Sequence, residues 1–259
     1  MNTKLFIFLF LCLSCTISGS LELASNDDPV TMLVSTLDGY LTAVDAKTGR
    51  EKWRYKESPI VESPHKVRQD FSFIPNPRNG ELYLVADQHL SRLPFTIPQL
   101  VKTSPCKSSD GILYAGSKKD VWIAMNPESG VHEETVPPQN ANSCPVGNPE
   151  TIFIGRTEYK VTMIDTKKKE KQWNATFIDY SSHLLPVDHR YPYQHFHSVA
   201  DGRLITVDAD TRQVKWRKNF KSVVVNLYLL KGDGMHRIPS TSLLFNFIGI
   251  IKINPWSSS

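Results

Sequence analysis

Three short segments of the sequence share one pattern, in which an aspartate precedes a tryptophan by eight residues. They are residues Asp45–Trp53, Asp165–Trp173 and Asp208–Trp216, and each follows a short apolar run (LTAV, VTMI and LITV). An aspartate side chain can accept hydrogen bonds from the amides of a turn, and the apolar runs have the composition of strands covered on both faces. The repeat therefore predicts β-hairpins, each returning a tryptophan that fills the gap between adjacent sheets.

The turn of the first hairpin contains Gly49, which can adopt the left-handed conformation that closes such a turn. Lys169 and Arg212 occupy the corresponding positions of the other copies. They would take that conformation at a cost of about 1 kcal/mol. A degenerate copy, NPESGVHEE (residues 126–134), keeps a glycine, Gly130, but has glutamate in place of the tryptophan.

The spacing of the copies indicates the fold class. Asn126, Asp165 and Asp208 follow one another at intervals of 39 and 43 residues. Periods near 40 residues with several strands per unit are typical of propellers and related arrays. Only the proline-bounded segment PQLVKTSP (residues 98–105) allows a short turn of helix. We therefore expect an all-β, propeller-like array of quinoprotein-type hairpins, incomplete as a ring.

The amino terminus has the layout of a secretory signal peptide. Lys4 precedes the apolar run Leu5–Leu13, and small residues follow, with cleavage expected near Ser18 or Ser20. The apolar run is too short to cross a bilayer, which argues against the alternative of a retained anchor. We expect a signal peptide over residues 1–20, a β-repeat domain over 21–242 and a divergent tail over 243–259.

Removal of the signal peptide would also remove Cys12 and Cys15. It leaves Cys106 and Cys144 in an oxidising compartment, where they can pair with each other, pair between chains or stay free. Two cysteines cannot form a disulfide framework for a chain of 259 residues. Asn174 begins an Asn-Ala-Thr acceptor for N-glycosylation, which fits the same compartment and requires a surface position.

Charge and motifs exclude several classes of function. The net charge of +4 is modest, and the basic run over residues 167–171 falls in a hairpin turn, so we expect no nucleic-acid partner. His195 and His197, with His183 and His189 upstream, have no cysteine or acidic partner at metal-ligand spacing. We expect them in a polar surface loop. The sequence contains no recognisable catalytic motif, and we expect neither a metal nor a cofactor.

Two family resemblances follow from the quoted motifs. The stretch DGYLTAVDAKTGREKW resembles the repeat of quinoprotein-type propellers, a class that includes quinone-dependent dehydrogenases and non-catalytic binding scaffolds. A closer resemblance covers residues 31–242. The segments SPCKSSDGILYAG and GRTEYKVTMIDTKKKEKQWNAT are similar to the luminal domain of the inositol-requiring kinase/endoribonuclease family, which senses stress in the endoplasmic reticulum.

The closer resemblance implies a luminal, non-enzymatic sensor of unfolded polypeptides. It implies inhibition by the luminal Hsp70 chaperone and activation by side-by-side homodimerisation, whereas kinase and endoribonuclease belong to another part of that family's chain, beyond a membrane span. The tail after Ser242 has at most nine largely apolar residues in a row, against about 20 for a span, which suggests a truncated product. At the position of Lys102 in the dimer seam, the resemblance implies an uncharged amide residue, so this sequence departs from the family pattern there. The residues that correspond to the dimer seam are Leu100, Pro105, Lys118, Asp120 and Trp122.

Two readings from other classes remain open at this stage. A secreted propeller-like scaffold would bind a protein or glycan, and a quinone-dependent dehydrogenase would reduce dyes in the presence of quinone and calcium. Stress-regulated self-association that depends on Trp122 or Asp120 would favour the sensor over both.

Overall fold

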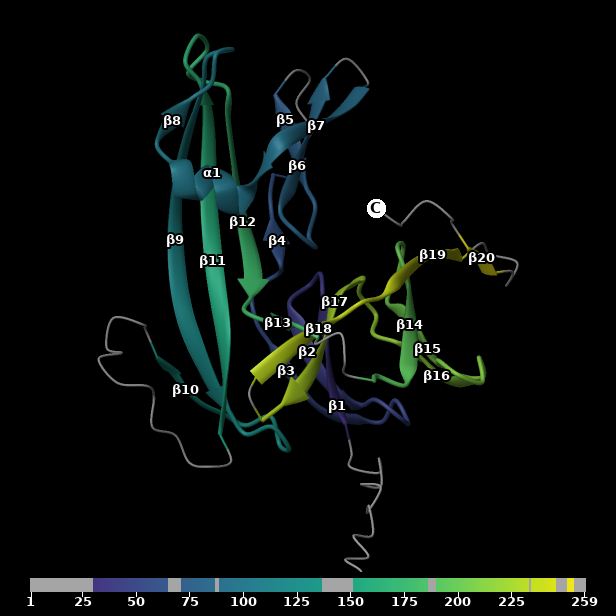
Figure 1. Ribbon diagram of the computed structural model, residues 1–259. Helices are drawn as coiled ribbons and strands as arrows, with labels where there is room; N and C mark the ends of the chain where they lie inside the picture. The colour runs from purple at the N-terminus through teal and green to yellow at the C-terminus, as the bar shows by residue number, and fades with distance from the viewer. Residues whose placement is uncertain are drawn as a thin grey trace, which may run out of the picture.

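The computed structural model describes residues 30–64, 71–86, 89–136, 151–185, 190–232, 234–245 and 251–253. Within these ranges the chain forms four β-sheets in a propeller-like arrangement, with one helix, α1 (Ile97–Thr103) (Figure 1). The predicted all-β fold is confirmed, and so is the short helical turn between prolines. The signal peptide over residues 1–20 lies outside the described residues, as does most of the tail.

Two six-stranded sheets contain most of the strands. The first has the order β13 (His183–Leu184), β18 (Gly234–Ile238), β17 (Val224–Lys231), β1 (Thr31–Thr36), β2 (Tyr40–Asp45) and β3 (Glu51–Lys56). The second has the order β10 (His132–Val136), β9 (Ile112–Met125), β11 (Ile152–Asp165), β12 (Gln172–Tyr180) and β4 (Val61–Glu62), with β8 (Cys106–Lys107) paired beside β9.

The two remaining sheets are smaller. One has the order β16 (Val214–Asn219), β15 (Arg203–Asp208), β14 (Tyr193–Ser198), β19 (Thr241–Phe245) and β20 (Ile251–Ile253), and the other is β5 (Ser72–Pro75), β6 (Glu81–Ala86) and β7 (His89–Thr96). Neighbouring strands are antiparallel except for β13 with β18 and β14 with β19. In Figure 1 the long strands β9 and β11 stand upright, and α1 lies across them.

The repeated turn is built as the aspartate and glycine require. The amide of Asp45 donates to the carbonyl of Arg50, the amide of Gly49 donates to the carbonyl of Asp45, and the Asp45 carboxylate accepts from the amide of Thr48 at 2.7 Å. Gly49 has a φ of 72° and Arg212 a φ of 61°, so both occupy the left-handed region. The hydrogen bonds that form the first turn therefore join residues within that turn.

The turn after Asp165 differs from the prediction that Lys169 adopts the left-handed conformation. Lys169 is not among the described residues with positive φ, because this loop is one residue longer: the amide of Asp165 donates to the carbonyl of Lys171. The regular turn also occurs where the Asp–Trp spacing does not reveal it. Between β5 and β6, the amide of Gly80 donates to the carbonyl of Asn76, as in the other copies.

Each of two repeat tryptophans packs against the turn of a neighbouring sheet. The indole of Trp53 donates from Nε1 to the carbonyl of Pro127 at 2.7 Å, and its ring lies against Gly130 in the β9–β10 turn. Trp216 likewise donates to the carbonyl of Ala46 at 2.9 Å, with its ring against Gly49. The hairpin glycine of one sheet therefore makes room for the tryptophan of the next.

Replacing Gly130 by alanine should lower the free energy of unfolding by about 2–4 kcal/mol. A φ of 68° disfavours any side chain, and the added Cβ would lie 2.4 Å from Cδ2 of Trp53. Chemical denaturation monitored by circular dichroism measures the change. Gly232→Ala is the matched control, because its Cβ would meet no atom within 4 Å and its φ is not positive. Equal effects of the two variants would contradict the packing role of Gly130.

The third repeat tryptophan, Trp173, is only 4% exposed and packs edge-on against Phe73 of β5, with ring centroids 5.2 Å apart. It belongs to the larger of two core clusters, which joins the first, second and three-stranded sheets. A smaller cluster, which includes Trp216, joins the first sheet to the sheet of β14–β16.

The prediction that His195 and His197 lie in a polar surface loop is wrong. Both side chains are 2% exposed on β14, because the segment YQHFHS forms a strand whose alternate residues face inward. His195 contacts the hydroxyls of Tyr191 and Thr206, and His197 contacts Arg78. Burial lowers the pKa of His195 to about 4, so this histidine is neutral at physiological pH. His189 lies outside the described residues.

Candidate interaction edge

One side of strand β9 is only partly covered by other strands. Its inner side pairs with β11 along its whole length, from Ile112 to Met125. On its outer side β8 covers residues 113–114 and β10 covers 122–125. Among the described residues no strand covers the outer side between them. We call residues 117–121 the β9 edge (Figure 1).

The direction of the free backbone groups follows from one hydrogen bond. The amide of Gly116 donates to Oγ of Ser104 at 2.6 Å, outside the β9–β11 ladder. Alternate residues of a strand direct their amides to the same side, so the amides of Lys118 and Asp120 also point outward. Within the part of the chain that the structure describes, both residues therefore offer unpaired backbone donors and acceptors at the edge of the sheet.

Two opposite charges lie on this edge. Nζ of Lys118 is 2.9 Å from Oδ2 of Asp120, and Oδ1 of Asp120 accepts a hydrogen bond from Thr157 at 2.6 Å. The hydrogen bond to Asp120 raises the pKa of Lys118. Burial opposes ionisation of Asp120, but the bonds from Thr157 and Lys118 outweigh it and lower its pKa. Both side chains are therefore charged at neutral pH, and both remain accessible.

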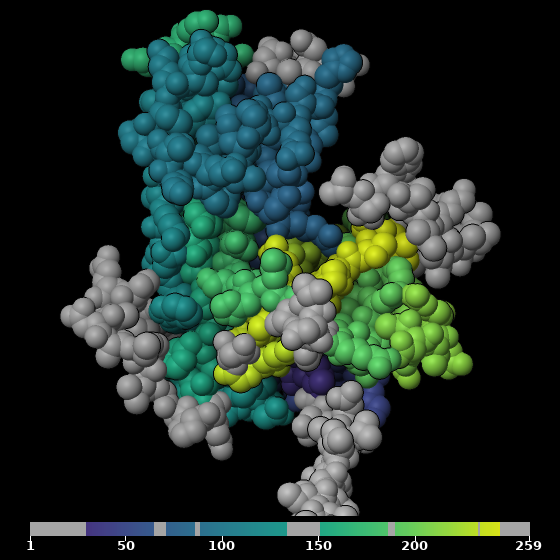
Figure 2. Space-filling model, viewed as in Figure 1, coloured from purple at the N-terminus to yellow at the C-terminus, as the bar shows by residue number. Residues whose placement is uncertain are grey.

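The residues predicted for a dimer seam lie in different environments. Trp122 is half-buried and packs over Gly155, beside the exposed residues 116–119, and Pro105 is exposed next to β8. Leu100 is 3% exposed and belongs to the large core cluster, so it is not available on the surface of the chain. Figure 2 shows the surface formed by β9 and α1. The unpaired backbone of this edge emerges only from the pairing of β8, β9 and β10.

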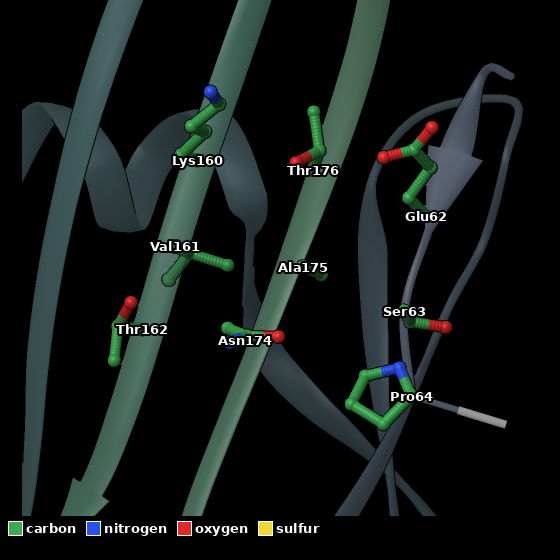
Figure 3. Close-up of a pocket in the computed structure, with 9 residues that line it drawn as sticks. All are labelled: Glu62, Ser63, Pro64, Lys160, Val161, Thr162, Asn174, Ala175 and Thr176. Carbon is green, nitrogen blue, oxygen red and sulfur yellow. The ribbon is translucent and has the colours of Figure 1, made fainter. Parts of the chain in front are cut away.

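The predicted glycosylation residue lies on a different face. Asn174 is exposed on the outer face of β12 and lines a hollow of about 500 Å³ between β12 and the segment after β4 (Figure 3). The hollow exists because β4 pairs with β12 only through Val61 and Glu62 before the strands diverge. A glycan on Asn174 stays a prediction, and this position gives it open space.

Of the two cysteines that remain after the signal peptide, the structure describes only Cys106. Cys106 has a free thiol beside α1 and lines a hollow of about 350 Å³ with Phe95 and Tyr114. Cys144 lies outside the described residues. In the ranges that the structure describes, no three histidine, cysteine or acidic side chains gather as metal ligands would. The same ranges hold no helix with the length and hydrophobicity of a membrane span.

Comparison with known proteins places this geometry in context. Residues 17–218 match a family model described as outer membrane protein assembly factor BamB. The chain is 50% identical over 210 residues to the serine/threonine-protein kinase/endoribonuclease ire-1 of Caenorhabditis elegans, covering 81% of this chain and 22% of that protein. It is 36% identical over 215 residues to the human serine/threonine-protein kinase/endoribonuclease IRE2, covering 82% of this chain and 22% of the relative.

A solved structure shares the fold. The compact lumenal domain of yeast Ire1 aligns with a TM-score of 0.62 and 22% identity, over 85% of this chain and 76% of that one. The chain spans about a fifth of the length of the curated relatives that it matches.

Proposed function

We propose that this chain, which belongs to the repeat family described as outer membrane protein assembly factor BamB, is a lumenal stress-sensing domain. Over most of its length it matches Ire1-type kinase/endoribonucleases. It acts in the endoplasmic-reticulum lumen by regulated self-association and by binding unfolded polypeptides. It has no catalytic activity of its own, and the kinase and endoribonuclease named for its relatives belong to longer proteins.

The observation that carries this proposal is the β9 edge. A strand with unpaired amides and carbonyls adds a further strand readily, and the exposed lysines and aspartate keep it soluble until it does. The likeness to the lumenal domain of yeast Ire1 supports the same reading at the level of the fold.

The charges on the edge favour a second copy of the chain as the added strand. A symmetric pair is isologous, so residues meet in reciprocal contacts. Antiparallel pairing of outward-facing residues about Lys119 would place Lys118 opposite the partner's Asp120, twice in each dimer. The same register places Lys119 opposite the partner's Lys119, a single repulsive contact. Trp122 and Pro105 flank the pairing as apolar contacts.

Unfolded polypeptides and the luminal Hsp70 chaperone complete the proposed mechanism. An extended segment of an unfolded protein has the backbone geometry to add to the same edge. The family resemblance supports a chaperone that holds the domain inactive until unfolded protein draws it away. Regulation then consists of competition for a surface that the folded monomer leaves unpaired.

Sedimentation equilibrium of the purified chain tests the proposal. We expect concentration-dependent dimerisation, which Lys118→Pro weakens about tenfold or more because each strand loses one donor to its partner. The amide of Lys118 is not used in the β9–β11 ladder, so the midpoint of thermal unfolding should change little. Lys118→Ala controls for the lost charge.

Lys119→Pro is the contrasting variant, because the alternation directs the amide of Lys119 toward β11. It should lower stability, whereas Lys118→Pro should lower association. A chain that remains monomeric at high concentration and captures no unfolded polypeptide would overturn the proposed function.

A further inference from the structure

A second surface, remote from the β9 edge, combines positive charge with apolar side chains. It is a cavity of about 650 Å³ that is lined by β17 and β18, by the β5–β6 turn, and by Leu184 at the end of β13 with the residue after it. The residues that matter for its chemistry are Arg78, Arg237, Leu184, Leu185, Asn226 and Ser240.

Arg78 reaches this cavity without an acidic partner. Its Nη2 lies 2.5 Å from Nε2 of His197 and 3.5 Å from Oγ of Ser240, and within the described ranges no carboxylate forms an ion pair with it. Burial, and secondly the charge of Arg78, lowers the pKa of His197 to about 4, so this neighbour is neutral. Among the described residues, no carboxylate therefore compensates the positive charge of Arg78, which is partly buried.

Arg237 adds a second guanidinium to the same cavity. Its carboxylate neighbour, Asp179, is 3.7 Å away, and its Nε is buried without a hydrogen-bond partner in the described part of the chain. Burial lowers the pKa of Arg78, and the charge of Arg237 lowers it further, so the two arginines repel each other. Asp179 pairs with Arg237 alone, at 3.7 Å, and an anion bound between the two guanidinium groups would relieve their repulsion.

The apolar wall and the size of the cavity indicate what kind of anion fits. Leu184 is 83% exposed, which is unusual for so large an apolar side chain, and Leu185 follows it along the wall. A volume of about 650 Å³ far exceeds an inorganic anion, but it accommodates several side chains of a peptide. The ligand should therefore carry a carboxylate next to an apolar group.

We infer that this cavity binds an acidic side chain of a polypeptide partner, with an adjacent apolar side chain against Leu184 and Leu185. Arg78 pairs with the carboxylate, and Arg237 contributes the second positive charge. The inference does not depend on the proposed dimerisation, because the cavity lies on other strands and uses none of the residues of the β9 edge.

Fluorescence anisotropy with two labelled, terminally blocked peptides tests the site on the purified chain. One contains the sequence Leu-Asp-Leu between glycines, and the other contains Leu-Asn-Leu. We expect the aspartate peptide to bind about tenfold more tightly, since a charge-assisted, bidentate bond is lost with asparagine. Arg78→Gln should abolish this preference, whereas Arg217→Gln, which changes an exposed arginine on β16, should retain it.

Two further measurements keep the result interpretable. Leu184→Ser should weaken binding of both peptides without loss of stability, because the side chain is exposed in the free protein. Thermal unfolding of Arg78→Gln should match wild type. Equal affinity for the two peptides, or an aspartate preference that survives Arg78→Gln, would overturn the inference. Displacement by inorganic phosphate as efficient as by unlabelled peptide would overturn the assignment to a polypeptide.

Discussion

Replacing Trp216 by alanine is expected to lower the free energy of unfolding by about 3–5 kcal/mol. The side chain is 8% exposed, its ring lies against Gly49, and its Nε1 donates to the carbonyl of Ala46 at 2.9 Å. Removal of the indole leaves a cavity between two sheets and a carbonyl without its partner. Urea denaturation, monitored by far-ultraviolet circular dichroism, measures the loss. Because small domains are stable by about 5–15 kcal/mol, this loss is a large fraction of the total free energy of unfolding.

The control variants separate packing from other effects. Trp216→Phe keeps a ring against Gly49 but loses the hydrogen bond, so it should cost about 1 kcal/mol from the bond and somewhat more from the smaller ring. Gly49→Ala should lower the free energy of unfolding of the wild-type protein, because the added Cβ would lie 2.6 Å from the indole of Trp216. It should cost less in Trp216→Ala, because two residues in contact are not additive. Additive effects, or a loss below 1 kcal/mol for Trp216→Ala, would contradict the packing role of this tryptophan.

Charge reversal at Lys118 is expected to weaken self-association roughly 30-fold. In the proposed register each Lys118 meets the partner's Asp120, so Lys118→Asp replaces two attractive pairs by two repulsive ones. At about 1 kcal/mol for each pair, the dimer loses about 2 kcal/mol. Sedimentation equilibrium at fixed ionic strength measures the dissociation constant, and the difference should shrink in high salt because both side chains are accessible.

Two variants test the register itself. The exchange Lys118→Asp with Asp120→Lys restores both pairs, so it should recover most of the lost affinity. Lys119→Ala should strengthen the dimer several-fold, because it removes the repulsion between the two copies of Lys119. If neither Lys118→Asp nor Lys119→Ala changes the dissociation constant of the dimer, the chain does not pair through the β9 edge, even if it self-associates.

Most of the hairpins could be predicted from local patterns. The aspartate that accepts turn amides and the glycine or arginine with positive φ act within five residues, so the sequence specifies them directly. The turn at Asn76–Gly80 is of the same kind but lacks the repeat tryptophan, and its motif, NPRNG, resembles NPESG at residues 126–130 closely enough to have revealed it. Lys169 was wrongly predicted because an extra residue in the loop changes the hydrogen-bond register.

The burial of polar residues could not be predicted in the same way. His195 and His197 alternate as residues on one face of a strand do. Because histidine occurs both in protein cores and on protein surfaces, the sequence does not show whether that face is buried. Arg78 and Arg237 lie 159 residues apart in sequence, and only the junction of separate sheets brings them to one cavity.

The hairpins, their turn hydrogen bonds and the need of the tryptophans for a neighbouring sheet follow from the amino-acid order alone. They depend on interactions within a few residues and on apolar surface that must leave water. Which side of β9 stays unpaired, and which charged side chains meet, depends on how the folded sheets pack. Among the described strands, residues 117–121 are left without a partner because β8 pairs only with residues 113–114 and β10 only with residues 122–125. Strand pairing is a long-range choice, made by the packing of the whole chain, and no local pattern records it.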